Sequence, residues 1–265
     1  MDDKQASIGT VARVVRILQV FSEASDDVSI KELSAITSLA PSTCHRLLHL
    51  LIEDDVVAFD ADRKRYHAGP EFIRIASLLA SKTSFSDIAL PFMERVVEVC
   101  REACAVVSYL RPRKLISTVG ILKSSNPLQY NTELFTARTP LWGATGQSIV
   151  AFLPRAEQEE LYDARDSDFY FGTQTRLPPR EEYLAKMETI KEQGYAKSHG
   201  QTIDGAVGIG APLYDKFGRV TGSLCVTVPE MRFDADAHDR IIGILIPQAQ
   251  ALSKVLGYLG TPAKS

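Results

Sequence analysis

Near the N-terminus, the stretch "APSTCHRLLHLL" (Ala40 to Leu51) combines hydroxyl, imidazole and guanidinium side chains with a run of leucines. At helical spacing, Ser42, Thr43 and Arg46 share one outward sector, opposite much of the leucine stripe. An arginine can form two hydrogen bonds with a guanine or contact a phosphate, and hydroxyl groups can do either. A solvated helix start would have the same composition, so the stretch alone supports both interpretations. The residues that could contact nucleic acid here are Ser42, Thr43, His45, Arg46 and His49.

A second basic cluster follows in the segment "DADRKRYHA". Arg63, Lys64 and Arg65 place three consecutive positive charges at the tip of a predicted hairpin, between the extended runs "VVAF" and "RYHA". Beside a helix that enters the major groove, such a tip would meet backbone phosphates. Basic hairpin tips are also simply soluble, so the cluster gains weight only from its position after the helix.

The elements around these clusters have the order of a winged helix-turn-helix. Apolar spacing predicts a helix in "GTVARVVRILQVFSEA", and Ser29 with Glu32 forms a capping box that opens a short helix ending near Thr37. Pro41 fits the first turn of a third helix, where its missing N–H has no intrahelical partner. Helix, short helix, turn, longer helix and hairpin within about 60 residues favour this fold. The side chains expected to be buried are Val11, Val14, Val15, Leu18 and Phe21 in the first helix, Ile30, Leu33 and Ile36 in the second, and Leu47, Leu48, Leu50, Leu51 and Ile52 in the third.

From Pro70 onward the sequence predicts a second domain. "PEFIRIASLLASK" predicts an apolar linker helix, and "SDIALPFMERVVEVCREAC" predicts the helix that opens the new domain. Strand-like runs then alternate with helical segments, which suggests an α+β fold with an antiparallel sheet flanked by helices. The predicted domains are therefore 1–69, a linker helix at 70–84, and 85–260. The predicted strands are "AVVSYL", "KLISTVGI", "LQYNTEL", "VGIGAPLYD" and "VTGSLCVTVP", and the predicted helices are Thr145 to Phe152, Arg155 to Ala164, Arg180 to Gln193 and Ala235 to Leu259.

Composition and charge limit the function. With 265 residues, 45% of them apolar and 24% charged, the chain is long enough for two folded domains. No stretch approaches the roughly 20 apolar residues of a membrane span, and the acidic start "MDDKQASIGT" is unlike a secretory signal, so we expect a cytoplasmic protein. The net charge is −3, and residues 1–85 hold ten Lys and Arg against twelve Asp and Glu. Any DNA-binding surface must therefore be a local patch.

Three other groups of residues could carry chemistry, and each favours a structural role. Cys100 and Cys104 would share a helix face, but two apolar-flanked thiols without a nearby histidine are more typical of a core than of a metal or redox site. "GAVGIG" runs into a proline, which predicts a strand rather than the helix of a nucleotide-binding loop. His199 and Cys225 lack an orienting third group and a hydrolase motif. We therefore expect reduced cysteines, no catalytic residues, no metal and no cofactor.

Taken together, these motifs resemble the IclR family of bacterial transcription regulators. The N-terminal match runs through "SIKELSAITSLAPSTCHRLLHLLIEDDVV" and "DADRKRYHAGPEFIRIASLL". It continues through "ATGQSIVAFLP", "EQGYAKS" and "GAVGIGAPLYDKFGRVTGSLCVTVP", and so covers nearly the whole chain. Three features differ from the family pattern. Pro41 stands where a lysine is common, the wing has no glycine near Arg63, and "AVGI" (Ala206 to Ile209) replaces the family's "GVRC".

The resemblance implies a GAF-like effector-binding domain, which holds a small organic acid in a cup between the sheet and the helices. Thr145 and Gly146 by themselves predict a helix start, whose free N–H groups favour a carboxylate. Cys225 and Thr227 point to the same side of their strand. A plain helix start and a buried core thiol are the structural alternatives. The positions that match the family's effector pocket are Ala144, Thr145, Gly146, Ser198, Gly208, Cys225 and Thr227.

Small residues at Thr145 and Gly208, with Trp142 and Phe135 nearby in sequence, indicate a roomier and more apolar pocket than a two-carbon acid needs. We therefore expect an aromatic acid as effector. The sequence as a whole predicts a ligand-responsive DNA-binding transcription regulator, and not an enzyme. The alternative is a small-molecule sensor or enzyme whose N-terminal domain serves only for dimerisation or protein docking.

Oligomeric state follows from the weak positive charge. A single winged domain of this composition would bind weakly, so we expect a homodimer that places two recognition helices on a palindromic operator in double-stranded DNA. The apolar linker helix from Phe72 to Leu79 could supply the dimer contact. The resemblance implies dimers that pair into tetramers.

Overall fold

In the computed structural model the chain divides into two compact units, Met1–Ser84 and Phe85–Ser265. The structure describes residues 9–260 except 25, 81–83, 131, 166, 168–169 and 171–174. The acidic start, the end of the predicted linker helix and the middle of "LQYNTEL" therefore lie outside the described residues. Each unit has a hydrophobic core of its own.

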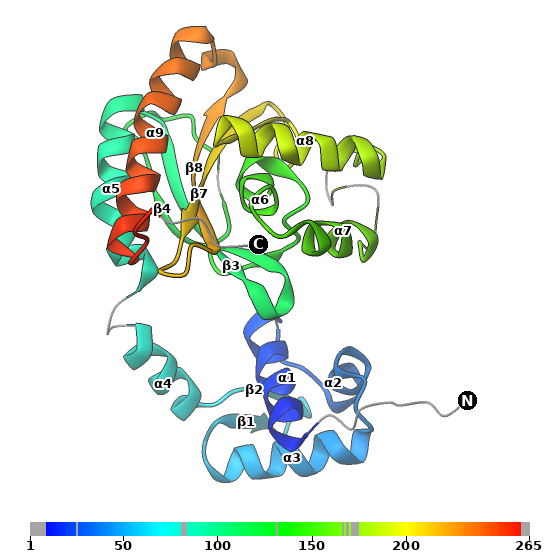
Figure 1. Cartoon of the computed structure of the whole chain (residues 1–265). Coiled ribbons are helices and arrows are strands. Elements are labelled where there is room, and N and C mark those ends of the chain that lie inside the picture. The colour runs from blue at the N-terminus through cyan, green and yellow to red at the C-terminus, as the bar shows by residue number, and fades with distance from the viewer. Residues whose placement is uncertain are drawn as a thin grey trace. The chain divides into compact units, whose positions relative to one another are not determined.

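The N-terminal unit is a winged helix-turn-helix, as predicted (Figure 1). The predicted capping box forms, because the Ser29 backbone N–H and hydroxyl donate to the Glu32 carboxylate while the Glu32 N–H donates to the Ser29 hydroxyl. Pro41 occupies the first turn of the third helix. The elements are α1 (Thr10–Glu23), α2 (Ile30–Thr37), α3 (Pro41–Glu53), the antiparallel hairpin of β1 (Val57–Asp60) and β2 (Arg65–Ala68), and α4 (Pro70–Ala80).

The core of this unit uses fewer apolar residues than the spacing predicts. In α1 the fully buried side chains are Ile17 and Val20, one stripe away from the predicted one. A helix with apolar residues on two neighbouring stripes satisfies the periodicity with either stripe, and contacts with the other elements decide which one is covered. The prediction of burial was therefore wrong for Val11, Val15, Ile36, Leu50 and Ile52, which are all exposed.

The wing turn closes without a glycine. The Asp60 carboxylate accepts hydrogen bonds of 3.0 Å from the backbone N–H groups of Asp62 and Arg63. Lys64 then takes the left-handed conformation, with a φ of 54°, that glycine usually supplies in such turns. The missing family glycine is thus replaced by a side-chain-stabilised turn with a lysine at its tip.

The C-terminal unit is built on a six-stranded antiparallel sheet in the order β5-β4-β3-β8-β7-β6, flanked by helices as predicted. Helices α5 and α9 cover one face, and α6, α7 and α8 lie on the other (Figure 1). The strands are β3 (Ala103–Leu110), β4 (Leu115–Leu122), β5 (Ala137–Arg138), β6 (Ala196–His199), β7 (Ala206–Tyr214) and β8 (Val220–Pro229). The helices are α5 (Phe85–Cys100), α6 (Gly143–Val150), α7 (Arg155–Asp163), α8 (Arg180–Gln193) and α9 (Ala235–Val255), with the 3-10 turns η1 (Arg111–Arg113) and η2 (Glu230–Arg232).

Two sequence predictions for this unit are wrong. The described residues of "LQYNTEL" form no strand, because side chains hold the segment as a loop: the Gln129 amide donates to the Ser124 and Asn126 carbonyls. Cys104 lies in β3 rather than on a helix face with Cys100, because α5 ends at Cys100. By contrast, "GAVGIG" runs into β7 and opens no helix, as predicted.

Candidate functional site

The front of α3 is the first candidate site. Its opposite side, with Cys44, Leu47 and Leu48, is buried in the core of the unit and so fixes the direction in which the front faces. Within the described part of the chain, the side chains of Ser42, Thr43, His45 and Arg46 form no hydrogen bond or ion pair, while the His49 imidazole lies 3.3 Å from the Glu53 carboxylate. Four of these five predicted residues are exposed and Thr43 is half-buried. The helix therefore presents a polar, singly basic surface with little internal pairing.

The three predicted basic residues of the wing differ in their exposure and in their partners. Lys64 is exposed at the tip, and no described residue pairs with its ammonium group. Arg63 is 73% exposed and lies 3.8 Å from Asp60 and 4.0 Å from Asp27, which is loose pairing. Arg65 instead turns back to the helices.

Arg65 connects the wing to the capping box of α2. Its Nε donates to the Asp27 carbonyl over 2.7 Å, and its Nη2 donates to the Glu32 carboxylate over 3.2 Å. The Ser29 N–H, the Ser29 hydroxyl and Arg65 together hold the pKa of Glu32 below its ordinary value of 4.5. In this geometry Arg65 supports the wing, whereas Arg63 and Lys64 point to solvent.

The second candidate site is the cup at the start of α6, where the structure brings together six of the seven predicted residues. The Ala144 N–H donates to the Ser198 hydroxyl over 2.9 Å, and the Thr145 hydroxyl donates to the Cys225 sulfur over 3.0 Å. A Cβ built on Gly208 would lie 3.1 Å from the Ser198 oxygen, so these segments are in close contact. The six residues Ala144, Thr145, Ser198, Gly208, Cys225 and Thr227 line a cavity of about 30 Å³.

Gly146 is the exception to this set. A Cβ at this position would overlap the Pro140 carbonyl oxygen, so the glycine allows close packing of α6 against the preceding turn. It lines neither this cavity nor the two cavities that adjoin it. The sequence therefore placed Gly146 in the correct element but gave it a role in ligand contact that the structure does not support.

The sequence suggested that the free N–H groups at the α6 N-terminus bind a carboxylate, but two of these N–H groups already donate to acceptors within the protein. The Gly143 N–H donates to the Gln201 side-chain oxygen over 2.9 Å, and the Ala144 N–H is taken by Ser198. Burial raises the pKa of the Cys225 thiol to about 11, although the Thr145 and Thr227 hydroxyls act in the opposite direction. A neutral thiol is a poor nucleophile at physiological pH, which agrees with a non-catalytic role.

A larger cavity adjoins the cup. It has a volume of about 750 Å³, and it shares wall residues with a middle cavity of about 70 Å³ that reaches Thr145, Cys225 and Thr227. Phe135, which the sequence suggested as a neighbour, is 71% exposed and lines neither of them. Trp142 does line both. The shared wall, of which the sequence predicted only Trp142, consists of Thr132, Arg138, Thr139, Trp142, Tyr170, Thr202 and Ile203.

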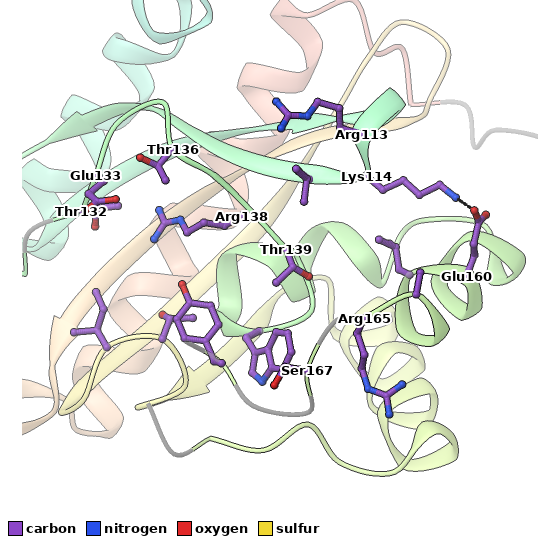
Figure 2. A pocket seen from close by; sticks show the side chains of 17 residues that line it. Arg113, Lys114, Thr132, Glu133, Thr136, Arg138, Thr139, Glu160, Arg165 and Ser167 are labelled. Atoms are coloured by element: carbon purple, nitrogen blue, oxygen red, sulfur yellow. Dashed lines mark ion pairs between the residues drawn. The ribbon is translucent and has the colours of Figure 1, made fainter. Parts of the chain in front are cut away.

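Charged side chains surround the large cavity. Arg138 lies across the cavity from Glu160 and Arg165, and Lys114 forms an ion pair with Glu160 (Figure 2). Arg138 is half-buried, and its guanidinium donates to the neutral Thr118 hydroxyl over 3.2 Å. The Trp142 indole N–H is buried and has no acceptor among the described residues. The sequence signal that could have found this site is the arginine just before "TPLWGATG", a cation next to the predicted pocket helix.

The described residues hold neither a cluster of metal ligands nor a membrane-spanning helix. Over those ranges no three His, Cys, Asp or Glu side chains are grouped closely enough to hold a metal ion. No helix among them is both long and apolar enough to cross a bilayer.

Comparison with known proteins agrees with both units. The family model described as "Bacterial transcriptional regulator IclR C-terminal" matches residues 78–254, and the IclR helix-turn-helix domain matches residues 10–61. The HTH-type transcriptional regulator KipR of Bacillus subtilis is 27% identical over 94% of this chain and 97% of its own length. The HTH-type transcriptional regulator KdgR of Dickeya chrysanthemi is 24% identical over 99% of this chain and 84% of its own.

Solved structures show the same fold. An IclR transcriptional regulator from Alicyclobacillus acidocaldarius superimposes with a TM-score of 0.75 at 20% identity, covering 94% of this chain and 99% of that chain. An IclR homolog complexed with 4-hydroxybenzoate, from Microbacterium hydrocarbonoxydans, gives a TM-score of 0.69 at 19% identity over 94% and 99%. Because the two family models together span most of the sequence, this chain belongs to the IclR family of DNA-binding transcriptional regulators.

Proposed function

We propose that this regulator reads a palindromic operator in double-stranded DNA through the front of α3. Ser42, Thr43, His45, Arg46 and His49 would face the base edges of the major groove, with Arg63 and Lys64 on the flanking phosphates. The observation that carries the proposal is the front of α3 itself, where an exposed arginine and two hydroxyls have no partner among the described residues. Arg65, the third basic wing residue, would act through the position of the wing.

A homodimer fits the remaining surface of this unit. Helix α4 exposes four large apolar side chains, which are Ile73, Ile75, Leu78 and Leu79. Burial of such a stripe against a second copy would provide the apolar area that a dimer contact needs. We therefore assign residues 1–69 to DNA binding, 70–84 to a linker helix that joins two copies, and 85–260 to effector binding, with dimers pairing into tetramers.

The effector in this proposal is a small organic acid, most simply an aromatic one, bound at the cup and its adjoining cavities. Hydroxyl and thiol groups line the cup, and a cation and an aromatic side chain line the middle cavity of about 70 Å³. A structural relative has been crystallised with 4-hydroxybenzoate. A sensor or enzyme whose N-terminal unit serves only for docking fits less well, because the similar curated proteins are named transcriptional regulators.

Charge reversal at the recognition helix tests the DNA-binding part. Arg46→Glu replaces a contact worth about 1 to 3 kcal/mol with repulsion, so affinity for the DNA upstream of its own gene should fall at least ~100-fold in a fluorescence anisotropy titration. Arg95→Glu, the same charge change at an exposed position of α5, is the matched control and should bind normally. Normal binding by the Arg46→Glu variant would show that α3 does not read the operator.

A further inference from the structure

The effector site has two parts of very different size. We use the name inner cup for the cavities of about 30 and 70 Å³ around Thr145, Cys225 and Thr227, and outer chamber for the cavity of about 750 Å³ next to α7. Seven residues belong to the walls of both the outer chamber and the larger inner cavity. We call this shared wall the junction, and Arg138 and Trp142 are part of it.

The inner cup is too small and too fully hydrogen-bonded to bind an aromatic acid. Its volume suits about two or three water molecules. Two of the backbone N–H groups at the start of α6 already donate to Gln201 and Ser198, and the Thr145 hydroxyl already donates to Cys225. A carboxylate would have to displace these bonds, so recognition of the anion must take place elsewhere.

The junction has a cation that no carboxylate of a described residue neutralises, which the cup lacks. Trp142 is 5% exposed, and its indole N–H has no acceptor in the described structure. That N–H is itself buried, so the rest of the Trp142 side chain, and not the N–H, lines the two cavities. Arg138 is half-buried and lines the same two cavities, and no carboxylate of a described residue forms an ion pair with it, including Glu133 of the same chamber. A guanidinium without an anionic partner recognises a carboxylate through charge-assisted hydrogen bonds.

The outer chamber has the volume and lining of a site for an extended apolar body. Cavities of roughly 300 to 1,000 Å³ hold ligands well beyond a single aromatic ring. Leu115, Leu161 and Ala164 give it an apolar lining on the side of β4 and α7. The Tyr170 ring lies 5.8 Å from that of Trp142, so two neighbouring aromatic rings form part of the junction.

We propose that the effector is an elongated acid, whose carboxylate binds Arg138 at the junction and whose apolar body packs on the Trp142 side chain and fills the outer chamber toward α7. This inference rests on the proposed function, because it assigns the chemical class of the ligand that regulates DNA binding. It replaces the helix N-terminus and the cup by the junction as the anion site. It also sets a length that single-ring acids do not reach.

Trp142 is the only tryptophan of the chain, so its fluorescence reports ligand binding at the junction directly. The probes are glyoxylate, 4-hydroxybenzoate, biphenyl-4-carboxylate and the uncharged biphenyl-4-carboxamide. Each is titrated into the full-length protein, with Trp142 fluorescence, the melting temperature and affinity for upstream DNA as readouts. We expect biphenyl-4-carboxylate to bind at least tenfold more tightly than 4-hydroxybenzoate, and the carboxamide to bind at least tenfold more weakly than its acid.

Variants locate the carboxylate. Arg138→Met should weaken biphenyl-4-carboxylate at least tenfold and remove its preference over the carboxamide, while Arg138→Lys should restore part of that preference. Trp142→Phe keeps an aromatic wall without the N–H and should bind the probe within about twofold of the wild type, read by melting temperature. Arg95→Met, which removes an exposed cation of α5 outside all three cavities, is the matched control and should bind the probe within about twofold of the wild type.

Three outcomes would overturn the inference, and they separate it from the proposed function. If acids bind and change DNA affinity but Arg138→Met binds them normally, the anion site is not the junction and the proposed function stands. If 4-hydroxybenzoate or glyoxylate binds more tightly than the two-ring acid, the predicted length is wrong and the proposed function again stands. If no acid in the series binds, the organic-acid effector and this inference both fail, while the Arg46→Glu result still decides DNA binding.

Discussion

The surface proposed to read DNA and the cavity proposed to bind the effector are built in opposite ways. The front of α3 and the wing come from one contiguous segment, residues 41 to 65. The cavity walls come from segments as far apart as Ala105 and Thr227, joined by β3, β8 and the loops around α6. The first site needs only one helix and the hairpin that follows it, whereas the second forms only when the whole C-terminal unit is folded.

This difference determines how each site tolerates change. The α3 front has almost no internal partners, so its polar side chains are replaceable without loss of the fold. The cup is close-packed, and side chains of β6 and of the loop after it accept hydrogen bonds from its backbone N–H groups. Substitutions on the front should therefore change DNA affinity alone, whereas substitutions at the cup should change stability first.

The largest expected effect is on the packing of α6, the helix that carries the cup residues Ala144 and Thr145. Gly146→Ala adds a methyl group that overlaps the Pro140 carbonyl oxygen, so α6 must move. We expect the free energy of unfolding of the C-terminal unit to fall by about 3 kcal/mol. Trp142 fluorescence during urea unfolding measures this directly, because the chain has no other tryptophan.

Gly243→Ala is the matched control for this variant. Gly243 lies inside α9, and nothing lies within 4 Å of a Cβ at that position. The alanine should leave stability unchanged or raise it by about 1 kcal/mol, because it favours the helix. Equal stability of the two variants would show that the α6 packing does not define the cup.

A smaller effect separates the two roles within the wing. Arg65→Met removes the bonds to Asp27 and Glu32, so the N-terminal unit should lose about 1 kcal/mol, with an unchanged salt dependence of DNA binding. Lys64→Met should leave stability within about 0.5 kcal/mol and lower the slope of log affinity against log salt by about one. Circular dichroism and anisotropy titrations measure the two quantities. If instead Arg65→Met lowered the salt dependence and left stability unchanged, Arg65 would be the phosphate contact and Lys64 would not.

The smallest expected effect is a pH dependence in the same support. The pKa of Glu32 is lowered in the folded state, so its ionised form stabilises that state at neutral pH, and this contribution is lost as the pH falls through the lowered value. Glu32→Gln has no such titration. The stability difference between wild type and Glu32→Gln should therefore shrink between about pH 7 and about pH 3 in urea unfolding followed by circular dichroism. A difference that stays constant over this range would show that Glu32 titrates as it does in the unfolded chain.

The same difference between the two sites explains which parts of the structure could be predicted from the sequence. The winged unit follows from local signals, such as the capping box at Ser29 and the proline at the start of α3, which act within a few residues. The grouping of Thr145 with Cys225 in one pocket came only from family resemblance, and the order of the strands was not predicted, because no local pattern encodes a contact between residues 80 positions apart.

The parts that sequence could not supply are long-range ones. Arg138 lies in a strand of two residues, too short for periodicity to detect. Arg65 is one of three adjacent basic residues, and only the folded position of Asp27 and Glu32 distinguishes it from Lys64. In α1 the spacing fits two stripes equally, and the tertiary contacts choose Ile17 and Val20.

Methylation interference on the upstream DNA tests the central claim most directly, because dimethyl sulfate modifies guanine N7 in the major groove, where α3 is proposed to bind. If α3 reads the major groove, methylated guanines should block binding in two symmetric half-sites, about one helical turn or a multiple of it apart. Interference confined to adenine N3 in the minor groove, or no interference at bases that are protected by the protein, would contradict the recognition of DNA by α3.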